Sequence, residues 1–144
     1  MSALTALEDA VLAALAEQLG GRAKTLETYQ GNWRADLKKE SWRLPAVLLM
    51  FKESRAEQVA PQSYDLTLDF TVLVVVRQLR GRAQGPGAGQ EVYELLASVR
   101  QALWHQDLGL NILPLALVRE EPLLNTQEST VYGAHYRTGE VQDF

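Results

Sequence analysis

The chain has 144 residues, a length that fits one domain with its own hydrophobic core. Apolar residues make up 47% and charged residues 22%, both near the globular average, so disordered, collagen-like and coiled-coil chains are excluded. The 14 basic and 18 acidic residues give a net charge of −4, which argues against a dedicated nucleic-acid-binding protein. Because cysteine is absent, disulfide frameworks, Cys-ligated metals and thiol catalysis are excluded.

The N-terminal segment has no basic residue before its apolar stretch, and Glu8 and Asp9 interrupt that stretch. No signal peptide is therefore expected. The longest apolar runs, at residues 10–16 and 72–76, are far shorter than the roughly 20 residues that span a bilayer. We expect a soluble protein of the cytoplasm without a membrane partner.

The first predicted element is a helix over residues 4–19, where leucines and a valine recur at the spacing of one buried stripe. Gly20 and Gly21 end it, because glycine adopts the left-handed cap conformation at little cost. A short strand is predicted over 24–29, and the charged segment 33–41 is either a turn of helix or a loop. The apolar run at 44–52 predicts a strand covered on both faces.

The most informative segment is a long strand predicted over residues 64–76. Apolar residues hold its even positions, while its odd positions are polar until residue 73. The strand is thus expected to be half-exposed at its start and buried on both faces near its end. Residues 53–63 are polar and predict an exposed connection, so the long strand would overhang its partner as an arm for another subunit. The candidate interface residues on this overhang are Tyr64, Leu66 and Leu68.

A glycine-rich loop at 81–90 leads into a second helix, predicted over 89–106. Two closing strands are predicted over 112–119 and 129–138, with a turn region at Pro122 and Asn125 between them. The order of elements predicts one α+β domain over residues 1–144. We expect a mixed, mostly antiparallel sheet of four to five strands with two main helices packed on it.

No catalytic motif is found. The loop has glycines at positions 85, 87 and 89, but neither GxGxxG nor GK[ST], and acidic residues in the next helix would repel a phosphate. His105 and His135 have no second metal ligand at helical spacing, and GxSxG is absent. We therefore expect no enzymatic activity, cofactor or metal. A deep polar pocket around either histidine would instead favour a small cytoplasmic ligand-binding domain or hydrolase.

One basic cluster follows the long strand, and three tryptophans lie in or beside polar stretches. The basic side chains are either solvated or contact another subunit, with nucleic acid the least favoured partner. The tryptophans either pack at the edge of the core or, where exposed, anchor an interface. The candidate interface residues in these groups are Arg77, Arg80, Arg82, Trp33 and Trp42. Trp104 is likewise expected either to pack at the edge of the core or to anchor an interface. Reversing all three arginine charges is expected to impair assembly without changing thermal melting.

Six segments carry a resemblance that covers nearly the whole chain. They are LEDAVLAALAE at 7–17, the strand ending in Tyr29-Gln30-Gly31, LPAVLLMF at 44–51, VLVVVRQLRG at 72–81, YELLASVRQAL at 93–103 and STVYGAHYRT at 129–138. In this order they resemble the Mu-like prophage tail-protein family, which is related in fold to phage tail terminators. The family has no catalytic motif to transfer.

The resemblance implies a virion structural protein that forms a six-fold ring. Such a ring caps the polymerised tail tube, stops its growth and offers a docking surface for the neck or head connector. The implied partners are further copies in a hexamer, the tail tube protein, the sheath protein of a contractile tail and neck or connector proteins, with DNA only passing through the channel. The implied location is the head-proximal end of the tail, after assembly in the bacterial cytoplasm. A neck or head–tail connector protein is the alternative, and the loops at 53–63 and 81–90 are expected to contact neighbours.

Overall fold

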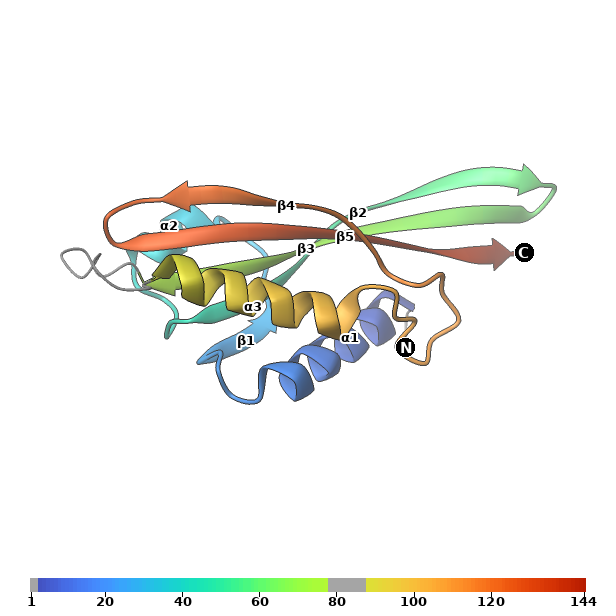
Figure 1. The fold of residues 1–144 in the computed structure, drawn as a ribbon. Helices are drawn as coiled ribbons and strands as arrows, with labels where there is room; N and C mark the ends of the chain where they lie inside the picture. Colours follow the sequence, from blue (N-terminus) through green and yellow to red (C-terminus); the bar gives the residue numbers. More distant parts are fainter. Residues whose placement is uncertain (1–2, 78–87) are drawn as a thin grey trace.

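The computed structural model describes residues 3–77 and 88–144, which form a five-stranded sheet with helices on both faces (Figure 1). The strand order is β1-β2-β3-β5-β4, and only β1 and β2 pair in parallel. This mixed sheet confirms the predicted α+β fold. The elements are α1 (Ala3–Leu19), β1 (Thr25–Thr28), α2 (Trp33–Lys38), β2 (Ala46–Ala60), β3 (Ser63–Arg77), α3 (Ala88–Leu103), β4 (Ala116–Asn125) and β5 (Ser129–Asp143).

Helices α1 and α3 lie side by side on one face of the sheet (Figure 1). The stripe of α1 that includes Val11 and Leu15 is fully buried, as the helical spacing predicts. It packs with α3 against alternate residues of β3, among them Val72 and Val74. Gly20 follows the helix with a φ of 58°, so the chain turns where the sequence predicts.

The opposite face is covered by α2 and the segment after it. Asn32 caps α2 by accepting a hydrogen bond from the Ala35 amide at 3.2 Å, which settles the charged segment as a short helix. The tryptophans of this region pack against a second cluster that includes Leu73 and Val75. Both faces of β3 are therefore buried at its C-terminal half, which explains why its polar–apolar alternation stops there.

The predicted connection over 53–63 is wrong. β2 continues to Ala60, and only Pro61 and Gln62 form the turn to β3. A bulge after Phe51 places Lys52 outside the regular register, and the side chains of 52–60 are all exposed. The polar segment is strand because β3 pairs with it, although it has no buried face of its own. The predicted overhang of the long strand past its partner is also wrong, because β2 pairs with β3 as far as Ala60. Instead β2, β3 and β5 extend together, with β5 reaching Asp143.

Three boundaries near the C-terminus also differ from the prediction. α3 ends at Leu103 rather than 106, because His105 adopts a φ of 66° and its amide bonds to the carbonyl of Leu115. β4 begins at Ala116, not 112. Pro122 lies within β4 instead of in a turn, because β4 is an edge strand with a bulge after Pro122 and needs no donor on its outer side.

Candidate assembly surface

The three long strands extend beyond both covering helices as one arm (Figure 1). We define the arm as residues 53–60 of β2, 63–69 of β3 and 137–143 of β5, which are joined by continuous antiparallel pairing. At about 3.4 Å per residue, the 15 residues of β3 span roughly 48 Å. The arm tip and the end of β3 at Arg77 therefore lie at opposite ends of an elongated molecule.

Ion pairs hold the base of the arm together. Arg137 donates a hydrogen bond from Nε to Oδ1 of Asp69 at 2.7 Å across the β3–β5 pair, and this contact raises the pKa of Arg137. Arg55 of β2 reaches the same carboxylate at 3.7 Å. Asp69 thus links all three strands, and its side chain is only 17% exposed, which keeps this pairing from being wholly screened by water.

The arm tip, defined as residues 56–66 and 139–143, carries only negative charge. It contains four acidic residues and no Lys or Arg, and none of the four forms an ion pair with another described residue. These residues are Glu57, Asp65, Glu140 and Asp143. Apolar side chains are exposed beside them, with Val59 at 54% and Val141 at 62%. The tip is an acidic surface that also exposes apolar side chains.

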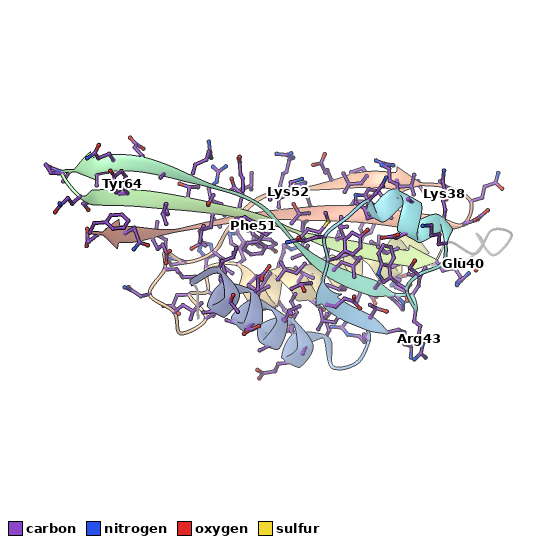
Figure 2. All side chains as sticks on the ribbon, turned by 180° about the vertical axis from the view of Figure 1, so that it is seen from behind. Lys38, Glu40, Arg43, Phe51, Lys52 and Tyr64 are labelled. Atoms are coloured by element: carbon purple, nitrogen blue, oxygen red, sulfur yellow. The ribbon has the colours of Figure 1, made fainter. Side chains whose placement is uncertain are left out.

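The structure places the three predicted interface residues of the long strand along this arm at different depths. Tyr64 lies at the tip (Figure 2) and packs edge-on against Phe144, with ring centroids 5.9 Å apart. Leu66 is half-buried, whereas Leu68, near the base of the arm, is buried and belongs to the main core cluster. In the single chain, Tyr64 and Leu66 remain accessible to a partner and Leu68 does not.

The other predicted residues meet at the opposite end of the molecule. Figure 2 shows Lys38, Glu40 and Arg43 at the end away from Tyr64. A groove of about 680 Å³ lies here between α2, the end of β3 and the β4–β5 turn. Its lining residues are Arg34, Leu37, Lys38, Glu40, Ser41, Trp42, Leu44, Arg77, Leu124, Thr126, Gln127, Glu128 and Ser129. We call this site the groove.

Both predicted tryptophans belong to this end, and each is half-buried. Trp42 lines the groove and packs edge-on against Tyr29 at a centroid distance of 5.2 Å. Trp33 carries the guanidinium of Arg34 at 4.4 Å above its ring. Arg77 is exposed and lines the groove, while Arg80 and Arg82 lie outside the described residues, as does most of the 81–90 loop.

Tyr29 connects the end of β1 to the elements that form the groove. Its hydroxyl donates a hydrogen bond to Oδ2 of Asp36 in α2, which ties β1 to the helix. Burial is the main cause that raises the pKa of Tyr29 to about 12, and the neighbouring carboxylate of Asp36 adds to the shift. The phenol therefore stays protonated and keeps donating this hydrogen bond across the physiological pH range.

His135 belongs to a hydrogen-bonded cluster that joins β3, β4 and β5. Nδ1 of His135 lies 2.7 Å from the hydroxyl of Thr71, and its Nε2 lies 2.6 Å from Oε2 of Glu121. Hydrogen bonds from Arg119 and then His135 lower the pKa of Glu121. This cluster lies on the sheet surface and lines neither the groove nor the small apolar cavity at the start of α1. Within residues 3–77 and 88–144, no group of acidic or histidine side chains is arranged to hold a metal ion.

Sequence reasoning missed the acidic tip and left Trp104 undecided. Trp104 is 42% exposed and stacks on His105 with ring centroids 5.3 Å apart, so it belongs to the surface. The acidic residues of the tip are far apart in the chain and become neighbours only through strand pairing. In the described part of the chain, no helix is long and apolar enough to cross a bilayer.

The fold and its surfaces define an α+β domain with an extended arm at one end and an open groove at the other. Over residues 3–139 the chain matches the protein family described as Bacteriophage Mu, Gp37, and it belongs to that family. This membership confirms the resemblance to a Mu-like phage family and indicates a virion-associated phage structural protein. No curated protein matches the chain.

Proposed function

We propose that this protein is a tail terminator, a non-enzymatic virion protein that closes as a ring on the end of the polymerised tail tube. The observation that carries the proposal is the arm, whose strands extend past the covering helices and whose β2 residues, 53–60, have no buried side chain. Strands that have no hydrophobic core packed against them are only marginally stable in water. Contact with other chains would bury the exposed side chains of the arm and stabilise it.

The position of the arm supports a ring. Its tip and the groove lie at opposite ends of the molecule, so the two surfaces differ and face away from each other. Two different surfaces produce head-to-tail contacts, which close into a ring when the rotation between copies permits it. A ring of six copies agrees with the resemblance to tail terminators.

The proposed partners follow from this role. One face of the ring meets the tail tube protein, the other offers the docking surface for neck or connector proteins, and the rim meets the last sheath ring of a contractile tail. DNA only passes through the channel, because the chain is acidic overall with a net charge of −4. The proposed location is the head-proximal end of the tail.

Tail length tests the proposal. Particles assembled without this protein are expected to have overlong or unstable tail tubes, and gold-labelled protein is expected at the head-proximal end of purified wild-type tails. Expression of the full chain in trans should restore normal length. Finished tails of normal length that fail to join heads would instead identify a neck or connector protein.

A further inference from the structure

The arm tip and the groove are complementary in both charge and polarity. The tip exposes Val59 and Ala60, and none of its four carboxylates forms an ion pair with another described residue. In the groove, apolar Leu37, Trp42 and Leu44 lie among cationic side chains. Protein interfaces combine apolar contacts with charges that are complementary on the two sides.

The cations of the groove are available to a partner. Lys38 and Arg77 are exposed and form no ion pair with another described residue. Arg34 donates a hydrogen bond to the carbonyl of Leu123 and lies over the ring of Trp33. Two carboxylates, Glu40 and Glu128, also line the groove, so its three cations exceed its anions by one. An acidic ligand is therefore favoured over a basic one.

The size of the groove fits a turn rather than a complete strand pair. Its volume of about 680 Å³ is in the range of pockets that bind drug-sized molecules, which is room for a few residues. The end of the arm is a two-residue turn, Pro61 and Gln62, between Ala60 and Ser63. A tight turn is a narrow, preorganised projection that loses little conformational freedom on binding.

We propose that the arm tip of one copy binds in the groove of a second copy of this chain, with Glu57 and Asp65 facing Lys38 and Arg77. This inference deepens the proposed ring, since it names the surfaces that join neighbouring copies, and it rests on that function. The contact is head-to-tail, because each copy offers one tip and one groove at opposite ends.

Disulfide trapping tests the contact without background, because the chain has no cysteine. The variant Gln62→Cys/Ser41→Cys places one thiol on the turn and one in the groove, both at exposed positions. At about 1 mM protein, even a contact with a millimolar Kd is substantially populated. Oxidation is expected to give a ladder of dimers, trimers and larger species. The control Gln62→Cys/Ala13→Cys moves the second thiol to the exposed side of α1 and should form no more of the ladder than random collision gives.

Charge reversal gives a second, independent readout on the double-cysteine background. Glu57→Lys/Asp65→Lys or Lys38→Glu/Arg77→Glu should each reduce the ladder roughly ten-fold at low salt. Combining the two pairs in one chain should restore it, whereas reversing Glu17 and Glu27, two exposed acidic residues outside the arm, should have little effect.

A ladder equal to that of the control, or no restoration on combining the reversals, would overturn the docking of tip in groove. The tail-length experiment separates the two proposals. Overlong tails in the absence of the protein, without a ladder, leave the terminator role standing and remove this contact. A ladder together with normal tail lengths removes the terminator role and keeps the contact.

Discussion

The hydroxyl of Tyr136 provides a test of the core that depends on a single oxygen atom. Tyr136 is 1% exposed beneath the helices, and its Oη has no hydrogen-bond partner among the described residues. Burial, with the nearby negative charge of Glu120, raises the pKa of this phenol, while Arg100 opposes the shift. The ring itself is well placed, since it stacks on Phe70 at a centroid distance of 5.8 Å.

Tyr136→Phe removes the oxygen and keeps the stacked ring. Burying a hydrogen-bond donor without a partner destabilises the folded state by about 1–3 kcal/mol. Removing the oxygen relieves this cost, but it also removes the van der Waals contacts of that atom, so the net gain in stability is smaller. We expect the free energy of unfolding to rise by about 1 kcal/mol, equivalent to a Tm increase of roughly 3 °C for a domain of this size. Urea unfolding followed by circular dichroism measures this change and should show an unaltered m value.

Tyr132→Phe is the matched control, because its hydroxyl is only 3.5 Å from that of the exposed Tyr93 and its loss should change stability little. A decrease of more than about 1 kcal/mol in Tyr136→Phe would refute the reasoning, because it would show that the Tyr136 hydroxyl is satisfied in solution, for example by a buried water.

Three further outcomes are expected. Because folding lowers the pKa of Glu121, this residue stabilises the protein above its ordinary pKa of 4.5, and the stabilisation is lost as the pH falls through its lower pKa in the folded state. Glu121→Gln should therefore make the free energy of unfolding fall less steeply with decreasing pH. The raised pKa of Tyr29 makes its contribution complete below pH 10.0 and lost as the pH rises through about 12, so ultraviolet titration of Tyr29→Phe should lack one late phenol ionisation. Gln62 has a φ of 64°, so Gln62→Gly should slow hydrogen exchange in the arm by relieving about 1 kcal/mol of backbone strain, and faster exchange would contradict this.

The candidate site was only partly predictable. Tyr64 and Leu66 were recognised because alternation marks one face of a strand, and the structure places both on the arm. In the sequence, Trp33, Trp42 and Arg77 are separate features with no common pattern. The packing of α2 against the end of β3 brings them to one end of the molecule. The acidic tip had no local signal, since its residues come from three strands.

Local patterns along the chain are enough to define the elements that bury apolar side chains at a regular spacing. α1 and the C-terminal half of β3 can be predicted because the spacing of their apolar residues along the chain matches the spacing of the side chains they bury. This local pattern does not depend on the rest of the chain. Family membership can be predicted for the same reason, because the apolar segments follow one another in a fixed order along the chain.

The length of β2, the three-stranded arm and the groove depend instead on contacts between distant parts of the chain. Residues 52–60 have no buried face, so nothing in their own pattern marks them as strand, and they are held extended by backbone hydrogen bonds to β3. The charge at the arm tip and the lining of the groove likewise depend on which strands and turns become neighbours. Pairing partners distant in sequence set these features, because hydrogen bonding between strands requires no particular side chain.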